Sequence, residues 1–323
     1  MEKEYDSCKL CPRNCNINRN KGEIGFCGET SDIRISWAGL HFGEEPPVTG
    51  KGGSGTIFIT GCNLGCVFCQ NYQISQQGMG KIVSREDFAH ICLELEKIGA
   101  ENINIVTGSH AIPAIASALK LAQQKGLSIP VLWNTSSYET PEAIDLLAGL
   151  VTVWLPDLKT LNSLLAEKTM HAPNYPTTAK KAIRRMADLS PLILEKVGEK
   201  DYPEGKITSG VIVRHLALPG KIADSAIVLH WFAEHLKDKA LLSLMTQYTP
   251  VTKNKETSTI DAFPNRMIDK TEFSELTSLL EDLAIDNGFF QELIQNNDWL
   301  PDFSQKQPFS SELAKPLWHW NHA

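Results

Sequence analysis

The 323-residue sequence lacks long apolar runs and an excess of basic side chains, and each absence excludes a class of protein. No stretch approaches the roughly 20 apolar residues that a membrane-spanning helix needs. The first residues, MEKEYDSCKLCPRNC, contain no apolar core of the kind found in secretory signals. Acidic side chains outnumber basic ones by 38 to 31, so no basic surface for a nucleic-acid backbone is predicted. We therefore expect a cytoplasmic protein that binds neither membrane nor nucleic acid.

A G-x-G-x-x-G loop is also missing after the first predicted strand, which disfavours dinucleotide binding. The chain instead alternates regularly between strand-like and helix-like stretches. The six predicted strands lie at 56–61, 101–108, 130–136, 150–159, 210–220 and 241–250. Because parallel strands need crossover connections, which helices supply, this order predicts a parallel sheet. Six units favour an α/β fold of the partial (β/α)6 TIM-like barrel type over a doubly wound sheet.

We expect three regions along the chain. Residues 1–50 form a cysteine-rich segment predicted to bind metal, residues 51–290 form the barrel, and residues 291–323 form a tail. The tail carries three of the seven tryptophans, which predicts that it packs on the barrel. Within the barrel, 192–213 is predicted to be a hairpin extension and 250–267 a polar surface loop.

Seven of the eight cysteines fall into two tight groups, and the eighth stands alone. In a reducing cytosol, clustered cysteines are more often metal ligands or redox groups than disulfides. The isolated Cys92 belongs to the apolar face of a predicted helix, together with Phe88, Ile91 and Leu95. We interpret Cys92 as a buried core thiol, because a free cysteine packs like a small hydrophobic side chain.

Cys62, Cys66 and Cys69 form a C-x3-C-x2-C triplet in GCNLGCVFCQN, directly after the first predicted strand. The triplet is therefore predicted at the carboxyl end of the sheet, where α/β barrels carry their chemistry. Three thiolates do not complete a structural zinc site, whereas on a four-iron cluster they leave one iron open to a substrate or cofactor. Gly61 and Gly65 suit a loop that folds closely around such a cluster. A zinc site completed by a remote His or Asp is the alternative.

Cys8, Cys11, Cys15 and Cys27 follow a C-x2-C-x3-C-x11-C spacing, which indicates a second metal site. Four thiolates complete a closed structural zinc site. The same four ligands also suit an auxiliary iron–sulfur cluster that relays electrons or helps to bind a substrate. A segment without metal is the third alternative, and the spacing does not distinguish among the three.

Five stretches resemble the radical SAM superfamily, and within it the pyruvate formate-lyase activating enzyme-like proteins with an N-terminal four-cysteine segment. They are CKLCPRNCNINRNKGEIGFCG, GSGTIFITGCNLGCVFCQNYQIS, NTSSYE, VIVRHLALPG and LMTQYTP. The resemblance implies a [4Fe–4S] cluster on Cys62, Cys66 and Cys69, with S-adenosylmethionine (AdoMet) bound to the fourth iron. It also implies reductive cleavage of AdoMet to a 5′-deoxyadenosyl radical that abstracts a hydrogen atom. A flavodoxin or ferredoxin is the implied electron donor.

The resemblance further implies which residues bind AdoMet. All of them lie at or near the carboxyl ends of predicted strands: Thr107, Gly108, Ser109, Asn134, Ser136, Arg214 and Gln247. Arg214 is expected to pair with the AdoMet carboxylate, because a buried guanidinium needs an anion; an internal ion pair is the alternative. For Asn134 and Ser136 the alternative is a turn held by their own side chains. Asp157 and Lys159 end the fourth strand, either facing the cleft or forming a rim ion pair.

The favoured function is a radical AdoMet enzyme acting on an unknown substrate, with activation of a glycyl-radical enzyme as the leading subclass. In that subclass another protein is the substrate and partner; modification of a small molecule, of a different protein or of RNA is the alternative within the same chemistry. An iron–sulfur electron carrier without AdoMet chemistry and a zinc-based binding module are the alternatives. No residue of the sequence is assigned as a substrate acid, base or nucleophile.

Overall fold

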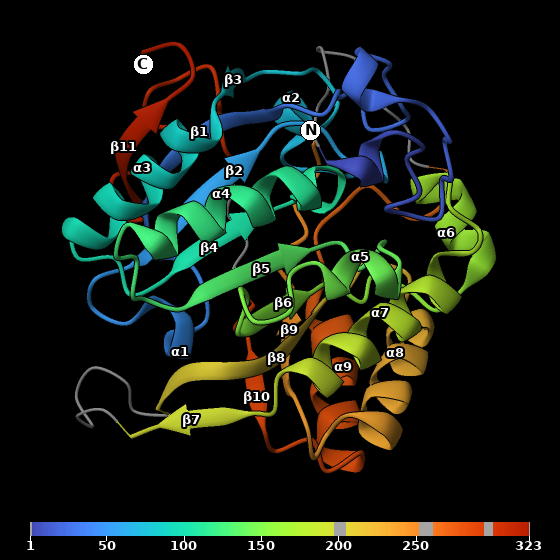
Figure 1. The fold of residues 1–323 in the computed structure, drawn as a ribbon. Coiled ribbons are helices and arrows are strands. Elements are labelled where there is room, and N and C mark those ends of the chain that lie inside the picture. Colours follow the sequence, from blue (N-terminus) through green and yellow to red (C-terminus); the bar gives the residue numbers. More distant parts are fainter. Residues whose placement is uncertain (1, 197–204, 252–260, 294–299, 323) are drawn as a thin grey trace.

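The computed structural model describes residues 2–196, 205–251, 261–293 and 300–322. Parallel strands form the centre of a mixed sheet, in the order β9-β8-β6-β5-β4-β2 (Figure 1). They are β2 (Ser54–Ile59), β4 (Ile103–Val106), β5 (Val131–Thr135), β6 (Val153–Pro156), β8 (Lys206–Leu216) and β9 (Leu241–Met245). Each of the six predicted strands overlaps one of them, which confirms the α/β class and the parallel sheet.

Helices connect the parallel strands and pack on the outer face of the curved sheet (Figure 1). The longer ones are α3 (Arg85–Lys97), α4 (Ile112–Gln124), α7 (Tyr175–Leu189), α8 (Ile222–His235) and α9 (Lys270–Asp282). The shorter α5 (Pro141–Asp145) and α6 (Ser163–Met170) complete the crossovers. Capping boxes begin α3 at Ser84 and α9 at Asp269, so the first free amides of both helices are bonded. Cys92 on α3 is fully buried, as predicted.

Antiparallel strands extend the sheet beyond β2, and the sequence analysis did not predict them. β1 (Ile33–His41) pairs with β2 on one side and with β11 (Ala314–His319) on the other. β3 (Lys81–Val83) pairs with the start of β1, and β10 (Gly288–Phe290) adds a short parallel strand beside β9. Residues 33–41 therefore belong to the central sheet, where they bring segments from both ends of the chain together.

Short elements complete the structure. They are the 3-10 helices η1 (Lys3–Tyr5), η2 (Arg19–Lys21) and η3 (Ser109–Ala111), the helices α1 (Pro46–Thr49) and α2 (Tyr72–Ser75), and strand β7 (Ile193–Glu195). β7 pairs antiparallel with β8, which confirms the predicted hairpin. The hairpin tip at 197–204 and residues 252–260 of the predicted polar loop lie outside the described residues.

The described part of the tail packs its aromatic rings against β1 and β2. The Phe303 ring lies edge-on to Phe58, with centroids 5.2 Å apart, and Phe309 lies edge-on to Trp37 at 5.7 Å. Trp320 donates its indole N–H to the Phe303 carbonyl at 2.9 Å. The tail thereby seals apolar surface at this end of the sheet. None of the described helices combines the length and apolarity that crossing a membrane requires.

We predict that Phe303→Ala lowers the free energy of unfolding by about 3–5 kcal/mol, because the change leaves a cavity among buried rings. Chemical denaturation of the purified protein measures the effect. Leu317→Ala is the matched control, since Leu317 lies in the same tail and is 36% exposed. Equal losses for the two variants would contradict the prediction.

Candidate metal and cofactor site

The loop with the cysteine triplet begins where β2 ends, at a point of close chain approach. Gly61 has a φ of +90°, and a Cβ atom there would lie 2.6 Å from Glu29 Cγ and 2.9 Å from the Cys27 carbonyl oxygen. Gly65 also has a positive φ, +75°. Both positions therefore require the backbone freedom of glycine, as the sequence analysis expected.

Hydrogen bonds hold the triplet loop to the elements around it. The Gly61 amide donates to the Ile74 carbonyl at 3.0 Å, and the Val67 amide donates to the Thr169 carbonyl of α6 at 2.9 Å. The Gln76 side chain donates to the Cys66 carbonyl at 2.9 Å. These bonds fix the backbone, so the loop is positioned before any ligand binds.

The three thiols of the triplet, Cys62, Cys66 and Cys69, are free and lie close enough to interact electrostatically. Burial raises the pKa of the Cys62 and Cys66 thiols, while the nearby Lys159 ammonium acts to lower both pKa values. Within the described residues, no three Cys, His, Asp or Glu side chains converge as ligands of a single ion would. Three thiolates on one loop are the number that leaves one iron of a four-iron cluster without a protein ligand.

Lys159 and Asp157 form an ion pair beyond β6, with Nζ 2.6 Å from Oδ2. Burial alone would lower the pKa of Lys159, but Asp157 and then Cys66 raise it above its usual value. Lys159 therefore supplies a positive charge beside the Cys66 thiol. The two residues thus form the ion pair of the second alternative, and this pair lies near enough to Cys66 to interact with it electrostatically.

The chain bends sharply where β4 and β5 end, beside the triplet loop. Thr107 and Ser137 both have a φ of +63°, a left-handed conformation that non-glycine residues rarely adopt. The Thr107 amide donates to the Asn134 carbonyl at 2.9 Å, so the two strand ends are bonded together. The Ser136 hydroxyl is buried without a hydrogen-bond partner among the described residues. Strained backbone and an unbonded hydroxyl are typical of ligand-binding sites.

Two of the residues predicted to bind AdoMet have other structural roles here. Ser109 donates its hydroxyl to Glu139 Oε1 at 2.7 Å, and Glu139 also accepts from the Trp133 indole at 3.0 Å. Gly108 packs against the same indole, because a Cβ there would lie 2.5 Å from the ring. Glu139 is fully buried, and burial raises its pKa. The sequence analysis gave Glu139 no role, although it ends the NTSSYE stretch.

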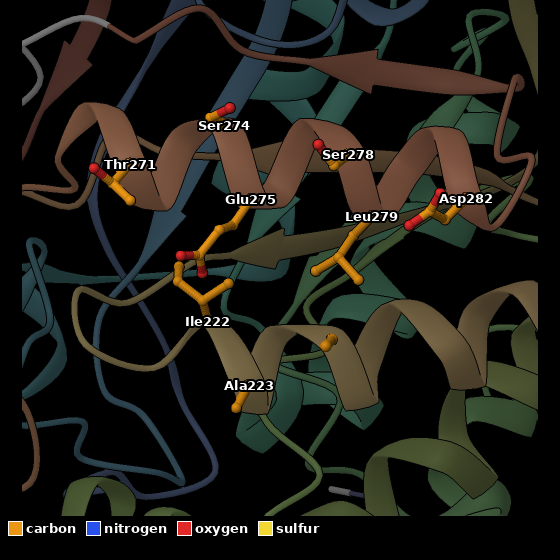
Figure 2. A pocket seen from close by; sticks show the side chains of 9 residues that line it. Ile222, Ala223, Thr271, Ser274, Glu275, Ser278, Leu279 and Asp282 are labelled. Atoms are coloured by element: carbon orange, nitrogen blue, oxygen red, sulfur yellow. The ribbon is translucent and has the colours of Figure 1, made fainter.

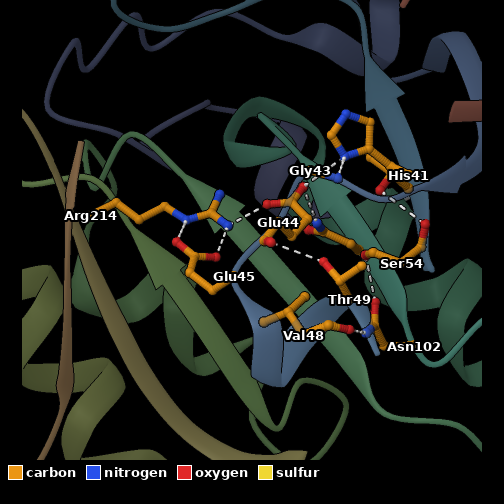
Figure 3. A network of polar contacts seen from close by, with 11 residues as sticks. His41, Gly43, Glu44, Glu45, Val48, Thr49, Ser54, Asn102 and Arg214 are labelled. Carbon is orange, nitrogen blue, oxygen red and sulfur yellow. Dashed lines mark hydrogen bonds and ion pairs between the residues drawn. The ribbon is translucent and has the colours of Figure 1, made fainter. Parts of the chain in front are cut away.

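Arg214 is engaged in an internal ion pair inside the barrel (Figure 3). Its Nε donates to Glu45 Oε1 at 2.9 Å, and its Nη2 donates to Glu44 and Glu45. Asn104 of β4 donates to Glu44 Oε1 at 2.9 Å, which extends the network across the sheet. The expected pairing of Arg214 with an AdoMet carboxylate is therefore corrected: the two glutamates from the β1–β2 connection already neutralise the guanidinium.

Gln247 follows β9, and its side-chain oxygen accepts from the Gln291 amide. The neighbouring Tyr248 donates its hydroxyl to Asn265 at 2.8 Å. Both contacts tie the end of β9 to later parts of the chain. Gln247 thus lies at the carboxyl end of its strand, as predicted, with its oxygen already bonded.

A separate groove runs between α8 and α9 on the outside of the molecule (Figure 2). Ile222 and Ala223 form one wall, and Glu275 and Leu279 form the other. None of the predicted site residues lines this groove. The cysteines and the strained strand ends therefore define the candidate site.

The curved parallel sheet and the thiol-rich loop at its strand ends define a partial α/β barrel protein. Residues 56–194 match the Radical SAM superfamily. Uncharacterized protein MJ0674 of Methanocaldococcus jannaschii is 31% identical over 288 residues, which is 87% of this chain and 76% of that protein. The chain belongs to the radical SAM superfamily and is a radical SAM enzyme. The family implies a [4Fe–4S] cluster and AdoMet as cofactors.

Solved structures superpose on this chain at low sequence identity. HydG, a maturase of the [FeFe]-hydrogenase, superposes with a TM-score of 0.50 and 15% identity, over 75% of this chain and 52% of HydG. SuiB of Streptococcus suis, solved with its precursor peptide SuiA, gives a TM-score of 0.47 and 14% identity, over 71% of this chain and 46% of SuiB. The chain spans about half the length of these two structures.

We predict that Arg214→Met lowers the free energy of unfolding by about 3–5 kcal/mol at pH 7, because Glu45 is left buried and unpaired. In the native protein burial acts to raise the pKa of Glu45, but Arg214 overcomes it and lowers that pKa below the usual range. The ion pair of Glu45 with Arg214 therefore stabilises the folded protein fully above about pH 4.3, the pKa of a glutamate in the unfolded chain. This stabilisation is lost as the pH falls below that value. Denaturation at pH 7 and pH 4 measures the difference between wild type and variant, which we expect to shrink at pH 4.

Arg185→Met is the control for this prediction. Its partner Asp145 is 45% exposed, so losing that ion pair changes stability by less than about 1 kcal/mol. Two results would contradict the role of Arg214 as the partner of Glu45. One is a loss of unfolding free energy as small for Arg214→Met as for Arg185→Met, and the other is a loss that does not change with pH.

Proposed function

We propose that this radical SAM enzyme holds its [4Fe–4S] cluster on Cys62, Cys66 and Cys69. One observation carries the proposal: three free thiols lie on a single hydrogen-bonded loop at the carboxyl end of the first parallel strand. The loop offers three thiolates for four irons, so one iron is left for AdoMet. Such a cluster supplies one electron to the AdoMet sulfonium, whose cleavage gives methionine and a 5′-deoxyadenosyl radical.

The chain's own residues would bind and orient AdoMet at the strand ends. The Ser136 hydroxyl and the Asn134 side chain are the donors and acceptors that β5 offers, and the strained backbone at Thr107 presents peptide groups beside them. Ser109 and Gly108 act indirectly, by fixing the position of this turn against Glu139 and Trp133. Lys159 provides a compensating charge for the anionic cluster beside Cys66.

For the substrate we propose another protein, from which a backbone glycine loses a hydrogen atom, as in glycyl-radical enzyme activation. The resemblance of five stretches to the pyruvate formate-lyase activating enzyme-like proteins supports this subclass. A reduced flavodoxin or ferredoxin is the proposed one-electron donor.

The test uses full-length protein, reconstituted without oxygen and reduced with dithionite in the presence of AdoMet. We expect release of 5′-deoxyadenosine and methionine, measured by liquid chromatography, and its loss in Cys66→Ala, which removes one of the three iron ligands. Cys92→Ala is the matched control, because it removes a buried thiol that lies outside both cysteine groups. An intact cluster that cleaves no AdoMet would instead favour an electron carrier.

The substrate assignment has its own measurement. Incubation of the reduced enzyme and AdoMet with a purified glycyl-radical enzyme should produce the glycine-centred doublet in the electron paramagnetic resonance spectrum. Cleavage of AdoMet without this signal across such partners would direct the search to other substrates and leave the AdoMet chemistry in place.

A further inference from the structure

A cavity in the N-terminal segment is enclosed by all four of its cysteines. Its lining residues are Cys8, Cys11, Cys15 and Cys27 together with Leu10, Arg13, Ile17, Arg19, Gly25, Phe26, Asn63 and His110. The four thiols are free, and the cavity wall also includes a residue of the triplet loop, Asn63. The four cysteines that the sequence pattern groups together therefore line one cavity.

The backbone of this segment is shaped around the thiols. The Cys8 amide donates to the Ile17 carbonyl, and the Asn16 amide donates to the Cys8 carbonyl, each at 3.0 Å. Asn14 and Asn16 take left-handed φ values of 44° and 55°, which turn the chain sharply on either side of Cys15. A Cβ at position 25 would lie 3.1 Å from Cys15 Sγ, so Gly25 lets the backbone approach that thiol. Turns of this kind are what a ligand loop requires.

A buried positive charge that forms no salt bridge among the described residues lies against the cavity. Arg19 is only 1% exposed, and no carboxylate forms a salt bridge with it among the described residues. Its guanidinium donates to the carbonyls of His110 and Thr30 and lies 4.0 Å from Cys8 Sγ. Glu29 interacts electrostatically with Arg19, but its Oε2 is bonded to Arg34 Nε at 3.1 Å. Four thiolates on a metal centre would add anionic charge beside Arg19, and a buried cation is stabilised by such charge.

A second unsatisfied group points to a ligand in the same place. His110 is 4% exposed and lines the cavity, and neither ring nitrogen has a hydrogen-bond partner of ordinary geometry among the described residues. The imidazole ring carries at least one N–H, which can donate to sulfur. Buried polar groups are nearly always bonded, so an occupant of the cavity is the expected partner.

We propose that the four-cysteine cavity holds a second [4Fe–4S] cluster, with Arg19 as its counter-charge and His110 as a hydrogen-bond donor to its sulfur. The four thiols line one cavity and so offer the four thiolates that a cubane binds, one on each iron. The cavity wall also includes Asn63 of the triplet loop, so a redox-active centre here would lie beside the proposed AdoMet cluster, a position from which a structural zinc ion would gain nothing.

The second site lies directly against the triplet loop. Arg13 donates from Nε to the Asn63 carbonyl at 3.0 Å and from Nη2 to the Leu64 carbonyl at 3.1 Å. The Cys27 carbonyl and His110 both face Gly61, the first residue of that loop. This contact fits an electron relay: one electron leaves a reduced flavodoxin or ferredoxin, enters the four-cysteine site and passes to the triplet site, with no bond made or broken. The relay, unlike the cluster itself, depends on the proposed function.

The first experiment measures metal content in the full-length chain, purified and reconstituted without oxygen. Wild type and Cys92→Ala should each contain about eight iron and about eight sulfide, because two cubanes are loaded. Cys11→Ser/Cys15→Ser and Cys66→Ser should each fall to about four iron, with no zinc gained. Wild type that holds about four iron, with or without one zinc, would overturn the second cluster. Eight iron without AdoMet cleavage would overturn the proposed function only.

The next measurement concerns Arg19 and the relay. Arg19→Met keeps all seven clustered cysteines, and we expect a downward shift in the reduction potential of one cluster, the one whose spectrum does not respond to AdoMet. In Cys11→Ser/Cys15→Ser, AdoMet cleavage driven by flavodoxin should be lost while cleavage driven by dithionite persists. Unchanged potentials would overturn the role of Arg19, and equal rates with both reductants would overturn the relay.

Discussion

The loop that carries Cys62, Cys66 and Cys69 starts at a residue with no room for a side chain. At Gly61 the backbone passes so close to Glu29 and to the Cys27 carbonyl that a single added carbon would overlap both. The first turn of the loop is therefore shaped partly by the N-terminal segment and not by the barrel alone. Arg13 completes this contact from the other side, by donating to the loop and to the Met170 carbonyl at the end of α6.

Inside the barrel some polar side chains are bonded to one another, while others, at the rim formed by the strand ends, are not. Glu44 and Glu45 neutralise Arg214, and Asn104 donates to Glu44, which joins the β1–β2 connection to β4 and β8. At the strand ends, Ser136 keeps an unbonded hydroxyl beside strained backbone. Buried polar groups are normally paired, so a ligand that binds at this rim would gain a hydrogen bond to the Ser136 hydroxyl.

Local patterns were enough to predict much of the fold. The six parallel strands follow from apolar runs separated by helical periodicity, and the buried position of Cys92 follows from the spacing of one helix face. β11 was missed because its pairing with β1 joins residues almost 300 positions apart, such as Trp37 and His319. No turn or local periodicity indicates such a partner, since the stability of a strand depends on its tertiary contacts.

The same limit applies to the site. The sequence shows that a buried Arg214 needs an anion, but the chemistry of a guanidinium is satisfied equally by a cofactor carboxylate or by Glu45, which lies 169 positions away. Similarly, the sequence alone suggests that the Ser109 hydroxyl donates to a ligand, whereas the structure shows that it donates to Glu139. Residue type identifies the need for a partner, and only the three-dimensional structure identifies the partner.

The formal charge of the whole chain does not describe the charges that lie beside its cysteines. The chain is acidic overall, with a formal charge of −7, yet cations lie beside both groups of thiols: Arg19 near Cys8, and Lys159 near Cys66. Thiolates on iron–sulfur clusters form anionic centres, and buried anions need nearby cations or hydrogen-bond donors. Lys159 is also paired with Asp157, whereas Arg19 forms no salt bridge among the described residues. The position of these buried cations, more than the count of the cysteines, supports the proposed clusters.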